Sequence, residues 1–167
     1  MDTYFDLGGY SFPVTTKSAE AQAWFDRGIL WTYGYNHEEA ILCFERAIDA
    51  DPKCAMAHWG AGYASGPNYN MPWDLFDNAG RAAAARAGYV HARKALDMIA
   101  GVTRWEAALI HALPARYPQR DLLDPEVMKV WNADFADAMR DVFAAHPESH
   151  EVRTIFAESL LNLTPWK

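Results

Sequence analysis

A chain of 167 residues, of which 51% are hydrophobic, is long enough to bury a core as a single domain. Its formal net charge is −7, and its 15 Lys and Arg residues are scattered, whereas proteins that follow a phosphate backbone present a basic face. The composition therefore excludes an intrinsically disordered chain and argues against nucleic acid or an anionic membrane as the main partner.

The two cysteines, Cys43 and Cys54, form no CxxC pair, so neither a disulfide framework nor a zinc knuckle is indicated. The first residues are acidic and resemble no secretory leader, and no stretch approaches 18 apolar residues. We expect reduced thiols and a cytoplasmic protein.

The chain contains an internal repeat signal. The tetratricopeptide (TPR) pattern W-x2-L-G-x2-Y, A-x3-F and P is met at Trp24, Gly28, Ala40, Phe44 and Pro52. Arg27 and Trp31 replace the usual Leu and Tyr, and a shift of about 34 residues places Gly28 on Gly62. A second, weaker repeat is therefore expected, with Gly28 and Gly62 permitting close helix approach.

Hydrophobic periodicity and turn residues predict a chain made of helices. The expected helices cover residues 19–33, 37–50, 53–65, 76–100, 103–113, 125–145 and 148–163. The turn-rich segment 66–75 breaks the period, because Pro67 and Pro72 lack amide donors and restrict the residues before them.

Four blocks together resemble the opening of a family of long TPR-repeat proteins. They are Ala21–Gly28, Asn36–Ala40 (NHEEA), Asp51–Gly60 (DPxCAMAxWG) and Gly66–Asn68 (GPN). The resemblance implies an all-α fold, a TPR-like solenoid of antiparallel helix hairpins with an irregular insertion after the first helix of the second repeat. In one domain we then expect an N-terminal arm (1–18), a regular TPR part (19–65), a loop (66–75) and divergent helical repeats (76–167).

TPR proteins typically bind extended peptides on a concave surface formed by the first helix of each hairpin. By that analogy the face would be aromatic and apolar, carrying Phe25, Ile29, Tyr33, Trp59 and Tyr63. The leading hypothesis is accordingly a scaffold that binds a protein or peptide partner. The alternative for these side chains is that they pack against later helices.

His37 is the most suggestive single residue, since the helix start at Asn36 needs only the asparagine cap and the early acids. Antiparallel helices about Pro52 place it level with residue 67, so that His37, Asn68 and Asn70 meet at one edge. If the later helices fold back, His111, Glu158 and Asn162 join them. A metal ion or catalytic base then becomes a candidate there, with Glu106 or Glu158 to orient a histidine. The second hypothesis is therefore an enzyme or a small-ligand or metal-binding protein that uses this polar pocket.

Cys54 and His58 share a helix face and form a weaker candidate for a soft metal, although two ligands make a poor site. No cofactor is predicted, because the fingerprints of phosphate, dinucleotide and zinc-protease sites are missing. The last helix carries Leu160 and Leu161 on a face that we expect further repeats or a second subunit to cover.

Overall fold

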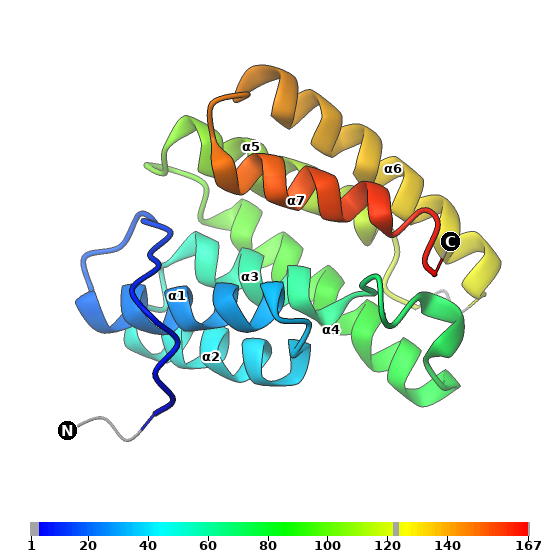
Figure 1. Ribbon diagram of the computed structural model, residues 1–167, viewed down its shortest axis with the longest axis horizontal. Helices are drawn as coiled ribbons and strands as arrows, with labels where there is room; N and C mark the ends of the chain where they lie inside the picture. The colour runs from blue at the N-terminus through cyan, green and yellow to red at the C-terminus, as the bar shows by residue number, and fades with distance from the viewer. Residues whose placement is uncertain (1–3, 122–123, 167) are drawn as a thin grey trace.

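The computed structural model describes residues 4–121 and 124–166, and in this part of the chain the secondary structure is helical, with no β-strand (Figure 1). The α-helices are α1 (Ala19–Tyr33), α2 (His37–Ala50), α3 (Ala55–Ser65), α4 (Asn78–Asp97), α5 (Arg104–Ala112), α6 (Pro125–Ala145) and α7 (His150–Leu161). Two short 3-10 helices, η1 (Trp73–Leu75) and η2 (Leu113–Arg116), complete the set. The all-α prediction is confirmed.

Side-chain caps explain where most helices begin. The first backbone N–H groups of a helix lack partners within it, and a short polar side chain at the cap accepts one of their hydrogen bonds. The capping residues are Ser18, Asn36, Asp77, Thr103, Asp124 and Ser149. The third helix has no such cap and begins at residue 55 rather than 53, because Cys54 has an extended backbone.

α3 is the central helix of the fold, and every one of its residues is buried. It packs against α1 and α2 on one side and against α4 and α5 on the other (Figure 1). A helix without a polar face is stable only when other elements cover all its sides. The small residues of the AMAHWGAGYAS segment allow these neighbours to approach closely.

The ring of Phe44 lies between Gly28 in α1 and Gly60 in α3, where a methyl group on either glycine would overlap the ring. The repeat alignment paired Gly28 with Gly62 instead. Gly62 faces a different neighbour, with Leu113 and His91 closest to it. α3 therefore approaches α2 through Gly60, which lies two residues before the glycine that the 34-residue repeat predicts.

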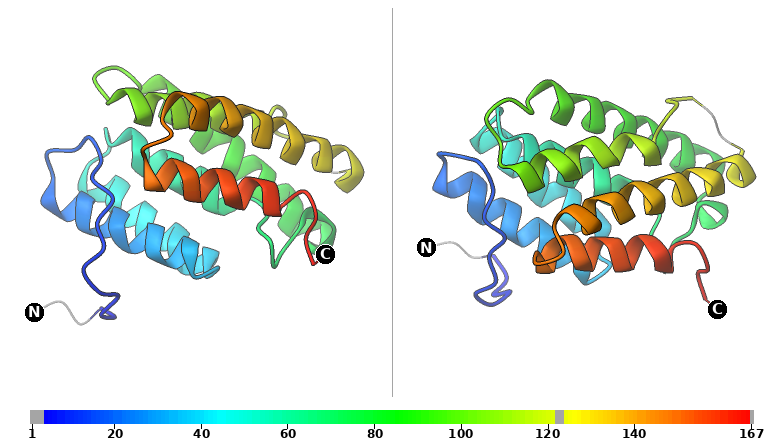
Figure 2. Two further views of the ribbon diagram at one scale, coloured as in Figure 1. Left: turned by 45° about the horizontal axis from the view of Figure 1, so that its top comes forward. Right: turned by 90° about the horizontal axis from the view of Figure 1, so that it is seen from above.

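The last two helices return across the molecule. α6 and α7 pack against each other as antiparallel helices, and α7 runs across α1 and α3 (Figures 1 and 2). Hydrogen bonds from Tyr63 to Glu158 and from Tyr10 to Glu151 tie α7 to the first part of the chain. The later helices therefore fold back over the first part of the chain, as the polar pocket around His37 requires.

Among residues 4–121 and 124–166, no helix is both long enough and apolar enough to cross a lipid bilayer.

Candidate functional site

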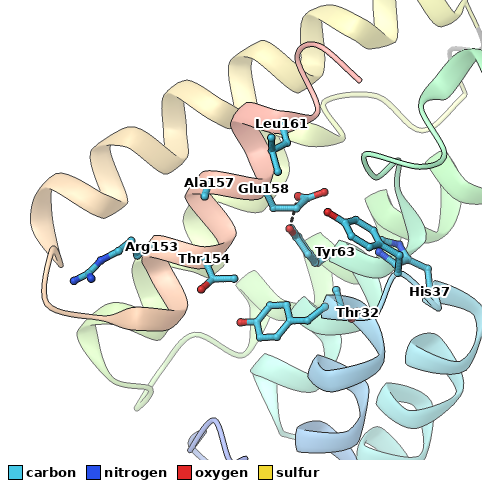
Figure 3. A pocket seen from close by; sticks show the side chains of 10 residues that line it. Thr32, His37, Tyr63, Arg153, Thr154, Ala157, Glu158 and Leu161 are labelled. Carbon is cyan, nitrogen blue, oxygen red and sulfur yellow. Dashed lines mark hydrogen bonds between the residues drawn. The ribbon is translucent and has the colours of Figure 1, made fainter. Parts of the chain in front are cut away.

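A cavity of about 420 Å³ lies where α7 crosses the ends of α1 and α3 (Figure 3). Its walls come from α1, the turn after it, the start of α2, α3 and α7. The lining residues are Thr32, Tyr33, Tyr35, His37, Tyr63, Arg153, Thr154, Ala157, Glu158 and Leu161. Two halves of the chain that are far apart in sequence therefore form one site.

One stripe of α7 faces this cavity. Thr154, Ala157, Glu158 and Leu161 follow the spacing i, i+3, i+4 and i+7, which places side chains on the same side of a helix. The core-facing residues Val152, Ile155 and Ser159 lie on an adjacent side and are buried. Burial of that side against α6 fixes how α7 presents the cavity stripe.

Glu158 is the centre of the polar part of the site. One carboxylate oxygen accepts a 2.5 Å hydrogen bond from the Tyr63 hydroxyl (Figure 3). The other oxygen accepts a 2.7 Å bond from the Asn162 amide. Tyr63 is only 3% exposed and stacks on the Trp59 ring, so its hydroxyl has little freedom to move. The carboxylate is thereby held in one orientation at the cavity wall.

Behind this wall lies Arg116, a fully buried arginine that is 1% exposed. Its guanidinium lies 5.0 Å from the ring centroid of Tyr63, and one terminal nitrogen donates to the Pro67 carbonyl. The nearby tyrosines and Glu158 raise the pKa of Arg116 even though burial opposes its charge. Arg116 therefore links the 66–72 loop to the Tyr63 and Glu158 pair.

His37 forms the wall between this cavity and a second one of about 340 Å³, which reaches Gly66 and Asn68. Its Nδ1 lies 2.9 Å from the Ala64 carbonyl, and because a carbonyl only accepts, this nitrogen carries the proton. Burial, helped by the charge of Arg116, lowers the pKa of His37 to about 4. At neutral pH the imidazole is consequently uncharged.

Of the aromatic residues expected on a concave face, Tyr33 lines the cavity directly and Tyr63 does so through its edge. Phe25 and Trp59 are 0% exposed, and Ile29 is 1% exposed. These three side chains pack in the core, which is the alternative to a concave binding face. Burial beneath later helices cannot be read from repeat spacing alone.

The polar residues expected at the His37 edge are brought together in part. Asn68 lines the smaller cavity with His37, and its side-chain oxygen accepts from the backbone N–H groups of Asn70 and Met71. The Asn70 side chain itself is exposed and lines neither cavity. Asn68 is thus occupied in closing the turn.

The three candidate metal ligands, His37, His111 and Glu158, do not all line one cavity. His37 and Glu158 line the same cavity, but His111 is exposed on α5 and is absent from its walls. In the described part of the chain, no three His, Cys, Asp or Glu side chains gather as a metal site requires. Glu106, which the sequence suggested as an orienting group, instead accepts hydrogen bonds from Thr15 and Thr103.

His58 has a partner that its sequence neighbours do not reveal. Its Nδ1 lies 3.1 Å from Nδ1 of His91 in α4, so the two imidazoles share one proton between these atoms. Cys54, the residue proposed to share a face with it, is fully buried and free. Burial raises the pKa of the Cys54 thiol to about 11, which keeps the sulfur protonated at neutral pH.

Tyrosine rings and a carboxylate line the cavity between α1, α3 and α7. Its surface is mainly apolar, with tyrosine rings on one side and the fixed Glu158 carboxylate on the other. Arg153 donates to the Pro147 carbonyl and points away from Tyr63 and Glu158 (Figure 3). The charge that faces the cavity is therefore that of Glu158.

Sequence reasoning missed the contribution of Tyr35, Thr154 and Arg116. The i, i+4 relation between Thr154 and Glu158 was visible in the sequence and marks a shared helix face. Tyr35 has a positive φ of 59°, which turns the chain between α1 and α2 toward the cavity. Nothing in the local sequence of Arg116 indicates that it is buried.

No protein-family model matches this chain, and no curated protein or solved structure matches it either.

Proposed function

We propose that this domain binds a small organic molecule with an apolar body and a positively charged amine, in the cavity between α1, α3 and α7. The observation that carries the proposal is the Glu158 carboxylate, fixed by Tyr63 and Asn162 at the wall of a mainly apolar cavity. An ionised carboxylate has room for about four hydrogen bonds, and two are used here. The N–H groups of a protonated amine would donate the remaining hydrogen bonds to the carboxylate.

The surroundings favour a cationic amine over an anion. His37 carries no charge at neutral pH, and Arg153 is engaged with a backbone carbonyl outside the cavity. Arg116 is sealed behind Tyr63, so it supports the carboxylate without meeting the ligand. The aromatic rings of Tyr33 and Tyr35 add surfaces that attract cations through their negative faces.

The cavity size agrees with a compact ligand. A volume of about 420 Å³ falls in the range of small-molecule sites, and few polar groups within an apolar wall are typical of them. We infer binding rather than catalysis, because burial lowers the pKa of His37, the nearest candidate base, to about 4, and such an imidazole is a weak base at neutral pH.

A matched series of ligands tests the proposal. Phenethylamine, 2-phenylethanol and phenylacetate have similar bodies and differ in the charge of the head group. Isothermal titration calorimetry on the full chain should detect the amine and rank it above the alcohol, with phenylacetate weakest. Glu158→Gln should lower the affinity for phenethylamine by about tenfold or more, because a charge-assisted hydrogen bond contributes more than a neutral one.

Glu148→Gln provides the control, since it removes the same charge from an exposed position outside the cavity. It should leave amine affinity unchanged. Equal affinity for the three ligands, or equal loss in both variants, would rule out recognition of a cation by Glu158.

The scaffold hypothesis of the sequence analysis receives less support. A peptide-binding face built on Phe25 and Trp59 needs these rings at the surface, and both are 0% exposed. Of the five residues expected on that face, Tyr33 alone is partly exposed. We therefore favour the cavity over an extended peptide groove.

We also infer that α1, α2 and α3 form a TPR-like hairpin followed by the first helix of a second repeat. Support comes from the helix bounds and from the small residues on either side of Phe44. Beyond α3 the longer helix α4 and the return of α7 depart from a regular solenoid. That departure creates the cavity.

A further inference from the structure

A further cavity, apart from the two that His37 lines, lies between η1, α6 and the segment that follows α7. Its volume is about 580 Å³, and its walls include Trp73, Asn132 and Asn162. It shares no lining residue with the cavity around Tyr63 and Glu158.

Three side chains of this wall carry a buried polar atom without a hydrogen-bond partner. They are the Nε1 atom of Trp73 and the Oδ1 atoms of Asn132 and Asn162. The three residues are 0%, 6% and 6% exposed. Buried polar groups are normally paired, and leaving them unpaired destabilises a fold. Three such atoms around one cavity point to a ligand that pairs them.

The direction of the Asn162 amide is determined by its other contact. Its Nδ2 donates to the Glu158 carboxylate, which only accepts, so Oδ1 must be the atom left over. The Trp73 indole can only donate. The wall thus offers one fixed donor and one fixed acceptor, with the Asn132 amide able to take either role by rotation.

The two charged side chains in the wall of the cavity have opposite signs. Asp74 and Lys129 both line it and face each other at 3.9 Å, and Lys129 also pairs with Glu126. A charged ligand would have to break this arrangement. Apolar surface from Pro72, Leu163 and Pro165 alternates with the polar groups.

We propose that this cavity binds a neutral polyhydroxylated ligand, a monosaccharide or disaccharide. A hydroxyl group both donates and accepts, so adjacent hydroxyls can pair the indole N–H and the two amide oxygens together. The carbon-bound faces of a sugar ring suit the apolar wall. Asn162 is common to this proposal and to amine binding, since its amide nitrogen donates to Glu158, whereas Trp73 and Asn132 line this cavity alone.

Ligand-observed saturation-transfer NMR on the full chain tests this with glucose, galactose, maltose and myo-inositol. Urea and acetamide serve as probes that donate and accept without being polyhydroxylated. We expect transfer to at least one sugar and none to urea or acetamide. Absence of transfer to every sugar, or equal transfer to urea, would overturn the proposal.

Two variants locate the site. Asn132→Leu and Trp73→Phe should each weaken the sugar by about tenfold, because each removes a hydrogen-bonding group from the wall. Asn70→Ala, at an exposed position outside this cavity, should have no effect. Unchanged sugar affinity in both cavity variants would contradict the assignment.

Stability separates a binding role from a structural one. Asn132→Leu removes a buried amide oxygen that has no hydrogen-bond partner, so its Tm should be equal to or higher than that of the wild type. Trp73→Phe retains an aromatic ring and, with its fold checked by circular dichroism, decides the outcome if Asn132→Leu does not fold. Asn132→Leu should bind phenethylamine with unchanged affinity, so the sugar proposal and the amine proposal can be refuted separately.

Discussion

The Tyr63 hydroxyl donates a 2.5 Å hydrogen bond to Glu158, a residue 95 positions later in the chain. This bond joins the central helix α3 to α7, and it lies at the wall of the cavity between α1, α3 and α7. The same contact therefore holds the returning helix and orients the carboxylate on which the proposed function rests.

Replacing Tyr63→Phe should reduce the free energy of unfolding by about 1.5 to 3 kcal/mol, the usual range for a hydrogen bond to a charged group. Urea denaturation measures the change. Tyr89→Phe, on the partly exposed side of α4, is the matched control and should change stability little. In a double-mutant cycle with Glu158→Gln the two losses should not add; full additivity would mean that the pair does not interact.

The glycine contact with Phe44 gives a second prediction. Gly60→Ala places a methyl group against the Phe44 ring, and such overpacking costs about 1 to 3 kcal/mol. The substitution should destabilise the protein even though alanine favours helix by about 1 kcal/mol. Thermal unfolding measures this.

Gly9→Ala is the control for that substitution, because the space around Gly9 is open. Combining Gly60→Ala with Phe44→Leu should recover part of the loss, since a smaller side chain leaves room for the methyl group. A stabilising effect of Gly60→Ala alone would show that the ring moves aside without cost.

The His58 and His91 pair predicts a pH dependence. Burial lowers the pKa of His58 from 6.5 to about 4, and burial also lowers the pKa of His91. Below pH 6.5 the unfolded chain binds a proton that the folded protein does not, so stability falls as the pH decreases from 6.5 to about 4. His58 should account for about 2 to 3 kcal/mol of that loss.

Urea denaturation between neutral pH and pH 4 measures the slope, and an NMR titration of the His58 ring protons gives its midpoint. His58→Gln should flatten the profile, whereas His150→Gln, at an exposed position, should not. A His58 midpoint near 6.5 would contradict the burial of the neutral pair.

Glu106 anchors the N-terminal arm. It is 0% exposed and accepts hydrogen bonds from the backbone and hydroxyl of both Thr15 and Thr103. Glu106→Gln turns one acceptor into a donor that meets other donors, which should cost about 2 to 3 kcal/mol. Hydrogen exchange should also show faster exchange of the Thr15 amide.

Glu20→Gln, an exposed acid in the first turn of α1, serves as the control for the change of charge. If Glu106→Gln lowered stability without changing exchange at Thr15, the arm would be held by its other contacts, such as the Phe12 ring on Trp105.

The sequence by itself determined the helices. Caps such as Ser18 and Asn36 and the proline at position 125 are local signals, and the bounds 19–33, 37–50 and 125–145 agree with α1, α2 and α6. Capping and periodicity act over a few residues, so they can be read from one chain. The expected proximity of His37 to the residues after α3 also followed from local antiparallel geometry. It agrees with the cavity that His37 lines together with Gly66 and Asn68.

Tertiary structure alone decided which faces are buried and which helices meet. Trp59 lies in the core because α4 and α5 cover α3, and Glu158 reaches Tyr63 because α7 returns across the molecule. The burial of Arg116 and the pairing of His58 with His91 depend on the same long-range packing. Such contacts depend on how all the apolar faces are satisfied together, and no local pattern in the chain records that solution.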